Sequence, residues 1–238
     1  MLSIPLYLSQ QHACGYFDKR LAKSEFIHPA VKLTPALYAR LLEHGFRRSG
    51  NQVYRPHCTH CSDCIAIRLP VAEFRPTRIQ KRIQKKNRQL TTHIKPALFD
   101  PAHFDLYLKY QHVRHADGSM ASSSPEDYMQ FLGSDWCDTV FVEFLASGKL
   151  AAVAVIDRLP SAYSAVYTFF DPELSALSLG SYAVLWQIQQ LQSYSLPWLY
   201  LGFWLKDCRK MAYKDQYRPI QALLNGAWQE FFKGQKIT

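Results

Sequence analysis

The chain has 238 residues, of which 48% are hydrophobic and 14% aromatic, so it can bury a core, and this composition excludes a disordered polypeptide. No run of apolar residues approaches the roughly eighteen of a membrane-spanning helix. The net charge of +9 is one-sided, because residues 1–98 hold 17 Lys and Arg against 5 Asp and Glu while residues 99–238 hold 11 against 14, and this excess predicts that the first part faces a polyanion.

The start of the chain has no basic residue before Lys19, which differs from the layout of a secretory signal. We therefore expect a cytoplasmic protein whose six cysteines stay reduced. The first clear element is an amphipathic helix over residues 33–46. Thr34 is its expected N-cap, Pro35 follows directly, and Gly45 marks its end.

Three cysteines follow at close spacing. Cys58, Cys61 and Cys64 repeat the Cys-x-x-Cys spacing twice, and Cys14 is the natural fourth ligand. Four thiolates would complete a tetrahedral zinc site or hold an iron-sulfur cluster, whose role would be to fix the loop that positions the next segment. Reduced thiols packed as small hydrophobic groups, or a redox switch, are the alternatives.

Residues 75–88 form a strongly basic segment, in which seven of fourteen residues are Lys or Arg and none is acidic. The spacing predicts a helix that presents cations on one face and docks through a separate apolar seam. The cationic face would hold Arg78, Lys81, Arg82 and Lys85, and the seam Ile79, Ile83 and Leu90. Because an ordinary solvated face usually carries interspersed acids, their absence favours polyanion binding over that alternative.

The rest of the chain reads differently, after a linker expected at residues 93–101. Three apolar runs separated by short turns predict an antiparallel meander, at 139–146, 150–157 and 163–170. A helix over 171–195, a strand over 197–203 and a last helix over 222–232 are expected to follow. This layout predicts an α+β fold, with a small basic, Cys-containing N-terminal region at 1–95 and a second domain at 96–238.

The order of elements in the second domain resembles that of the acetyltransferase-like fold known as GNAT. Acetyl-CoA enzymes of that fold carry the pattern Arg/Gln-x-x-Gly-x-Gly/Ala before the central helix, where close backbone amides hold a pyrophosphate. The corresponding positions here are Ser175, Ser178 and Gly180, and only the last is a glycine. Side chains hinder close backbone approach, so the sequence favours another polyanionic donor over CoA.

Five segments in order resemble the arginyl-tRNA-protein transferase family, particularly its bacterial aspartate/glutamate leucyltransferase branch. They read "GFRRSGNQVYRPHCTHCSDC", "AEFRPTRIQKR", "VYTFFDPELSALSLGSYAVLWQI", "YLGFW" and "MAYKDQYRP". The resemblance implies a GNAT-like aminoacyltransferase domain and an enzyme of the N-degron pathway. Such an enzyme moves leucine from leucyl-tRNA to the α-amine of proteins that begin with Asp or Glu and marks them for degradation. The wider family also links comparable cysteines to metal or cluster binding.

The reaction that the resemblance implies is aminolysis of an ester, for which positioning matters more than a strong base. An α-amine of pKa about 7.7 to 8.0 is about one tenth neutral at pH 7. Polar groups between the third strand and the following helix are the catalytic candidates: Tyr167, Asp171, Ser178 and the backbone N–H groups near Gly180. Asp171 would receive the proton of the amine; the alternative is a turn residue before Pro172.

Donor and acceptor binding are expected from cationic side chains. The basic segment would bind the tRNA backbone through Lys81, Arg82, Lys85, Lys86 and Arg88. Tyr213 and Lys214 would orient the 3′ end or bind a phosphate, unless they are a core tyrosine beside a surface lysine. An arginine should face the acidic side chain of the acceptor, and the candidates are Arg55 and Arg78, followed by Arg47 and Arg48.

Two other functions remain open at this point. A plain acetyltransferase would leave the altered pyrophosphate loop unexplained, and a non-enzymatic RNA-binding protein would leave the second domain without a role. No cofactor is expected in the chemistry itself, and no membrane partner is expected.

Overall fold

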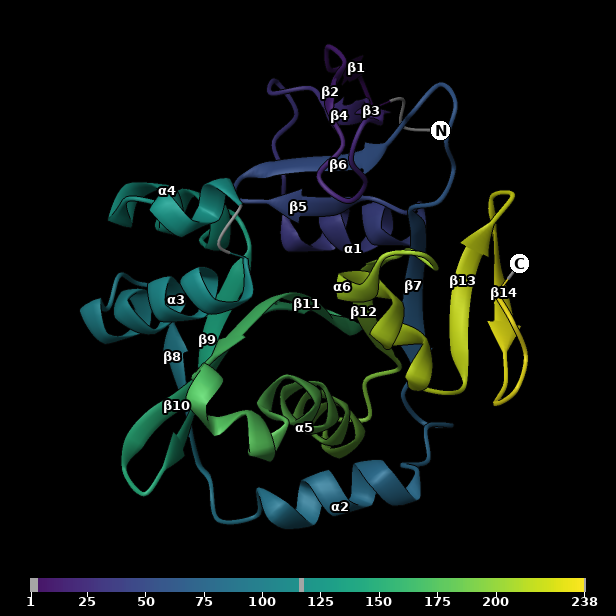
Figure 1. Ribbon diagram of the computed structural model, residues 1–238. Helices are drawn as coiled ribbons and strands as arrows, with labels where there is room; N and C mark the ends of the chain where they lie inside the picture. The colour runs from purple at the N-terminus through teal and green to yellow at the C-terminus, as the bar shows by residue number, and fades with distance from the viewer. Residues whose placement is uncertain (1–3, 116–117, 238) are drawn as a thin grey trace.

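An eight-stranded mixed sheet organises the part of the chain that this computed structural model describes, residues 4–115 and 118–237 (Figure 1). Every neighbouring pair of strands is antiparallel except β11 and β12, which run parallel. The spatial order is β14 (Ala227–Phe231), β13 (Ile220–Leu224), β7 (Ile65–Pro70), β12 (Trp198–Trp204), β11 (Ala162–Phe170), β10 (Lys149–Leu159), β9 (Asp138–Ala146) and β8 (Thr91–Pro96). The expected meander is β9, β10 and β11, and the fold is α+β.

Helices cover both faces of the meander, because alternate residues of each strand point to opposite sides. Val142 of β9 packs in one cluster with α5 (Leu179–Ser193), whereas its neighbour Phe141 packs in another with α3 (Pro101–Arg114) and α4 (Pro125–Leu132). Helix α2 (Arg78–Lys86) lies on the outer side of α5 (Figure 1). The meander is therefore enclosed between two apolar layers.

A smaller sheet and one helix stand above the large sheet (Figure 1). The sheet has the order β1 (Leu6–Leu8), β4 (Ser24–Ile27), β6 (Gln52–Pro56), β5 (Arg47–Ser49), with β2 (His12–Ala13) and β3 (Leu21–Ala22) paired separately. Helix α1 (Pro35–Glu43) begins as predicted, since the Thr34 hydroxyl accepts from the backbone N–H of Leu37. Gly45, at φ +80°, ends it in the left-handed region that favours glycine.

Short helical segments connect the remaining elements. They are η1 (Ser119–Ser122), η2 (Pro172–Leu177), α6 (Arg209–Ala212) and η3 (Tyr213–Gln216). Segment η2 joins β11 to α5, while α6 and η3 follow β12. No helix in the described ranges combines the length and the apolar character that crossing a bilayer requires.

Three expectations about the fold need correction. Residues 93–101 are not a linker, because β8 and the start of α3 lie there. Residues 222–232 are not a helix but the β13–β14 hairpin, whose turn at Asn225 and Gly226 has φ values of 51° and 79°. Both values suit the Asn-Gly turn of a hairpin. The division at residue 95 does not separate two folding units, since β7 and β8 are strands of the large sheet.

Candidate active site

The parallel strands β11 and β12 separate after a short pairing. Their register covers only three positions, from Ala162 opposite Trp198 to Ser164 opposite Tyr200. Beyond these positions β11 continues to Phe170 along β10, and β12 continues to Trp204 along β7, without pairing with each other. We call these diverging ends, residues 165–170 and 201–204, the strand split. Ligands of open sheets with parallel strands bind beyond the carboxyl ends of such strands, so the strand split is the candidate site.

Gly202 explains why β12 leaves its partner. Its φ of +73° is rare for residues with a Cβ, and the pairing of β12 with β7 shifts register between Tyr200 and Gly202. A glycine inside the apolar run "YLGFW" is the signal that could have identified this kink in the sequence.

Helix α2 lies across the outer face of α5 and contacts the segments that follow both strands of the strand split. At its start, the Gln80 side chain donates to the carbonyl of Gln216 in η3 at 3.4 Å. At its end, Lys86 Nζ donates to the carbonyl of Ala176 in η2 at 2.6 Å, and Asn87 donates to Leu177 at 2.8 Å. The basic helix is thus held close to the start of α5.

The cations of α2 point outward, and its docking face differs from the prediction. The exposed side chains are Arg78, Lys81, Arg82, Lys85 and Lys86, with Arg88 just beyond the helix. Ile79 was expected in the apolar seam but is 70% exposed. Buried Gln80 and Asn87, which cap the two ends of the helix, join Ile83 and Leu90 in docking it. Hydrogen bonds to loop carbonyls therefore replace part of the expected apolar contact.

The start of α5 is open. Ser178 precedes the helix in the left-handed conformation, with φ 53° and ψ 45°, and its side chain does not cap the first turn. Such a first turn presents backbone N–H groups that can bind an anion. At Gly180, a Cβ would lie 3.2 Å from the ring of Phe170, so this glycine lets the helix approach β11.

Asp171 and Tyr167 are engaged in structural bonds. The Asp171 carboxylate accepts from the backbone N–H of Glu173 at 3.0 Å and pairs with Lys109 Nζ at 2.9 Å. This is the turn residue that the sequence left as the alternative. The Tyr167 hydroxyl accepts from the amide of Gln111 at 2.9 Å, and burial raises its pKa well above the usual value. Lys109 therefore holds the Asp171 carboxylate in the turn, and the Tyr167 hydroxyl stays protonated at neutral pH; the catalytic roles of both residues stay predictions.

The four candidate arginines have different environments. Arg48 is fully buried and donates to both carboxylate oxygens of Asp157, at 2.7 and 2.6 Å, so its predicted role in acceptor binding is wrong. Arg55 pairs with Glu25 at 2.6 Å on the smaller sheet. Arg78 is exposed on α2. Arg47 is half-buried beside the strand split, and of the two arginines that lack an ion pair in the described residues, Arg47 and Arg78, it is the one removed in part from water.

Lys214 is not the surface lysine of the alternative interpretation. It is 7% exposed, and its Nζ donates to the carbonyl of Phe203 at 2.7 Å and lies 3.6 Å from the sulfur of Met211. Burial, followed by the charge of Arg47, lowers the pKa of Lys214 to about 7. Tyr213 is 47% exposed and remains available for stacking on a base. The alternative of a core tyrosine beside a surface lysine is therefore wrong, and the role of these two residues at the 3′ end stays a prediction.

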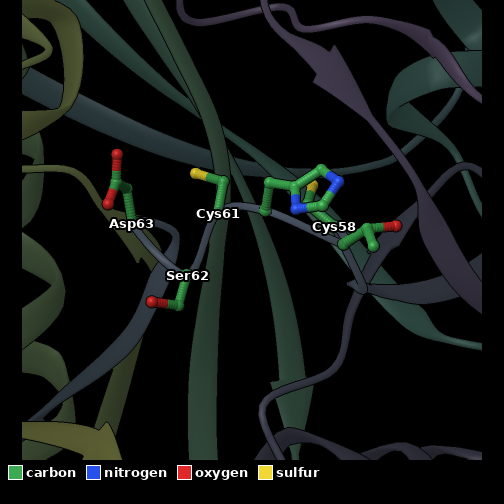
Figure 2. Close-up of a pocket in the computed structure, with 6 residues that line it drawn as sticks. Cys58, Cys61, Ser62 and Asp63 are labelled. Atoms are coloured by element: carbon green, nitrogen blue, oxygen red, sulfur yellow. The ribbon is translucent and has the colours of Figure 1, made fainter.

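The four cysteines come from two neighbouring loops. Cys58, Cys61 and Cys64 lie between β6 and β7, around a depression of about 300 Å³, and Figure 2 shows two of them with Ser62 and Asp63. All are free thiols. Burial, followed by the charges of Cys58, Cys61 and Cys14, raises the pKa of Cys64 to about 12. In the described residues their sulfurs do not form a group of three within 4.8 Å, so binding of an ion would draw the loops together.

A second group of metal-ligand types occurs at the edge of the sheet. Ligand atoms of Asp100, His103 and Glu143 lie within 4.8 Å of one another. Lys95 Nζ already lies 2.6 Å from Glu143, and Nε2 of His103 lies 2.7 Å from the same carboxylate oxygen. Nδ1 of His103 is buried without the acceptor that a metal-bound imidazole needs. This group is an ion-pair network that joins β8, β9 and α3.

Comparison with known proteins shows which family the sequence of this chain matches. The family model "Arginine-tRNA-protein transferase, N terminus" matches residues 12–82, and its C-terminal counterpart matches residues 102–224. An aspartate/glutamate leucyltransferase of Alcanivorax borkumensis is 46% identical over 228 residues, which cover 96% of this chain and 94% of that protein. One of Pseudomonas aeruginosa is 47% identical over 225 residues, covering 94% and 96%.

Among solved structures, L-PGS of Bacillus licheniformis aligns with 70% of this chain and 48% of its own, at 11% identity and a TM-score of 0.44. The sequence matches, in contrast, extend over both the cysteine loop and the strand split.

Proposed function

Because the chain belongs to the arginine-tRNA-protein transferase family, we propose that it transfers leucine from leucyl-tRNA to the α-amine of proteins that begin with Asp or Glu. Modified proteins are marked for degradation through the N-degron pathway. Both substrates are cytoplasmic, so the proposal places the enzyme in the cytoplasm. The observation that carries it is the position of α2, which holds a row of exposed cations beside the start of α5 and the strand split.

The GNAT-like assignment of the catalytic part rests on its topology. Three antiparallel strands are followed by α5 and then by β12, which pairs in parallel with β11 over three positions before the two diverge. In this assignment the strand split receives the aminoacyl ester, and the first turn of α5 takes the place of a pyrophosphate-binding loop. Ser175 at the Arg/Gln position and Ser178 at the first glycine position favour a phosphodiester over the diphosphate of CoA.

The donor would approach along α2. Exposed cations of this helix neutralise phosphates of the acceptor stem, and each neutralised phosphate adds a salt-dependent contribution to affinity. At the end of this path lies the exposed ring of Tyr213, which suits an unpaired base, next to the open first turn of α5. The charged end of the tRNA then reaches the strand split.

The transfer itself needs little acid-base assistance. The neutral α-amine attacks the ester carbonyl, a C–N bond forms, the C–O bond to the terminal ribose breaks, and the proton lost by the amine is balanced by the proton gained by the ribose hydroxyl. Positioning two substrates contributes about 7 to 11 kcal/mol, and a donor to the oxyanion about 3 to 4 kcal/mol. The N–H groups near Gly180 are the proposed oxyanion donors.

We also propose that Cys14, Cys58, Cys61 and Cys64 hold a structural zinc ion or iron-sulfur cluster. The all-thiol donor set fits either group, and the free thiols share one neighbourhood. A bound ion would fix the loop between β6 and β7, and with it the entry of β7 into the large sheet beside β12. Elemental analysis of protein purified without chelator and without oxygen tests this, and protein free of metal in every preparation would contradict it.

Mass spectrometry of a direct reaction tests the function. The protein is incubated with leucyl-tRNA and with peptides that differ only in the first residue: Asp, Glu, Asn, Ala or Lys. We expect leucine on the Asp and Glu peptides alone. Arginyl-tRNA and acetyl-CoA serve as competing donors in parallel reactions. Transfer of arginine would show that the transferred amino acid is arginine and not leucine. Transfer of acetyl would support the acetyltransferase, and tight tRNA binding without any product would support the non-enzymatic alternative.

A further inference from the structure

Two cations meet beside the strand split without an anion. Arg47 extends from β5 of the smaller sheet, and its guanidinium lies 5.5 Å from the ring centre of Phe203 on β12. Lys214 approaches the same residue from η3 through its bond to the Phe203 carbonyl. No ion pair in the described ranges includes either side chain. Adjacent cations that are largely removed from water are unfavourable unless an anion joins them.

The groups around Arg47 cannot neutralise it. Electrostatic neighbours of its guanidinium are the hydroxyls of Tyr54, Tyr16 and Tyr38, and only then Asp157, which is already bound by Arg48. Burial raises the pKa of Tyr16 to about 12, so this hydroxyl is neutral at pH 7. Arg47 therefore keeps its charge and its five donors without a charged partner.

Gly202 lets the guanidinium approach the backbone of β12. A Cβ at this position would lie 3.1 Å from Nη1 of Arg47 and 3.5 Å from Cζ. The kink that opens the strand split thus also makes room for the arginine. A single residue couples the geometry of the sheet to the position of the charge.

On the basis of the proposed function, we propose that Arg47 binds the acidic side chain of the acceptor protein, with Lys214 as a second cation beside it. The planar fork of an arginine matches a carboxylate in two parallel hydrogen bonds. The acceptor must place its α-amine at the ester in the strand split, and the side chain of its first residue is then only a few bonds away. Arg47 lies against Gly202 and Phe203 in the diverging end of β12, on the border of the strand split.

A phosphate of the tRNA is the competing occupant of these cations. The structure favours the carboxylate, because the exposed cations that suit a hydrated phosphate backbone lie on α2, whereas Arg47 is half-buried and Lys214 is 7% exposed. A small planar anion fits this setting better than a polyanionic strand. The test below separates the two.

Peptides that begin with Asp or Asn, otherwise identical, measure the role of Arg47. We compare kcat/KM for the two peptides in the wild type and in Arg47→Met and Arg47→Lys, and measure the affinity of each protein for leucyl-tRNA. Arg47→Met should lower the Asp/Asn ratio about 10- to 100-fold by raising KM for Asp, with tRNA affinity unchanged. Arg47→Lys keeps the charge but loses the planar fork, so its Asp/Asn ratio should lie between those of the wild type and Arg47→Met. Lys214→Met should lower the ratio by a smaller factor.

Arg158→Met is the matched control, because Arg158 is a surface arginine paired with Asp138, and its register partner Tyr163 precedes the strand split in β11. It should leave the ratio unchanged. Equal loss for Asp and Asn peptides in both Arg47 variants would make Arg47 structural and overturn the proposal, and weaker tRNA binding in these variants would assign it to the donor.

Equilibrium binding of the two peptides, measured without tRNA, tests the acceptor subsite independently of leucine transfer. A wild type that transfers no leucine but binds the Asp peptide through Arg47 would refute the function and retain the subsite. A wild type that transfers leucine while Arg47→Met keeps the full Asp/Asn ratio would retain the function and refute the subsite.

Discussion

Lys214 predicts a specific pH dependence of stability. In the unfolded chain its amine keeps the ordinary pKa of 10.5, whereas burial lowers the pKa in the folded protein to about 7. Between these two values the unfolded state binds more protons, so stability must rise with pH. The cost of burying the charged amine is fully present below about pH 7 and disappears as the pH rises to about 10.5. Each pH unit in this window corresponds to about 1.4 kcal/mol.

The magnitude follows from the size of the shift. A difference of about 3.5 pH units corresponds to about 5 kcal/mol, to within about 1.4 kcal/mol for an error of one unit. Replacing Lys214 by Met keeps an unbranched apolar stem and removes the titration. The stability of Lys214→Met relative to the wild type should therefore be highest at pH 7 and fall by about 1.4 kcal/mol per unit toward pH 10.

Urea denaturation at pH 7, 8 and 9 measures this difference directly, since the titration of other groups cancels between the two proteins. Lys214→Arg is a useful companion because arginine cannot lose its proton, so its destabilisation should persist up to pH 9. If the difference between wild type and Lys214→Met does not change from pH 7 to pH 9, the amine is not buried in the way the structure shows.

Three further predictions concern other parts of the molecule. Arg48→Met leaves a buried carboxylate unpaired and should lower the free energy of unfolding by about 3 to 5 kcal/mol; a loss below about 1 kcal/mol in urea denaturation would contradict the buried pair. Replacing Lys81, Arg82 and Lys85 by Gln should weaken tRNA binding and reduce the slope of log affinity against log salt by about 2 to 3, and an unchanged slope would remove α2 from the interface. Gly202→Ala should lower the Asp/Asn ratio of acceptor peptides while tRNA affinity stays the same, and an unchanged ratio would separate the kink from the arginine.

Local patterns predicted the elements whose signals are contained in a short window. The helix capped by Thr34 and the three strands of the meander follow from capping residues and apolar runs. Asn225 and Gly226 carried an equally local hairpin signal, but the apolar and aromatic residues around them were assigned to a helix. Residues 93–101 failed for another reason: β8 is half exposed at the edge of the sheet, so its sequence has the polar character of a linker.

The site depended on long-range contacts that no short window contains. Four arginines looked equivalent in the sequence, and only folding distinguishes them: Arg48 finds Asp157 from 109 residues away, and Arg55 finds Glu25 from 30 residues away. Lys214 looked exposed because its neighbours are polar, yet the turn of η3 directs it under β12. Sequence composition indicated which part of the chain is cationic, but not which cations lack a partner.

The absence of a carboxylate partner for Arg47 is a stronger argument for function than the cationic composition of the segment. Arg48 and Arg47 are adjacent in β5, and their side chains point to opposite faces of the strand, so one sequence step separates a satisfied charge from an unsatisfied one. Arg48 donates two hydrogen bonds to a buried carboxylate and four to other groups, which shows that the fold can neutralise an arginine at this place when stability requires it. Arg47 has no carboxylate partner and lies beside Lys214, an arrangement that lowers the stability of the fold. Such local conflicts are expected where a ligand completes the arrangement. An acceptor carboxylate would supply the one charge that this part of the structure lacks.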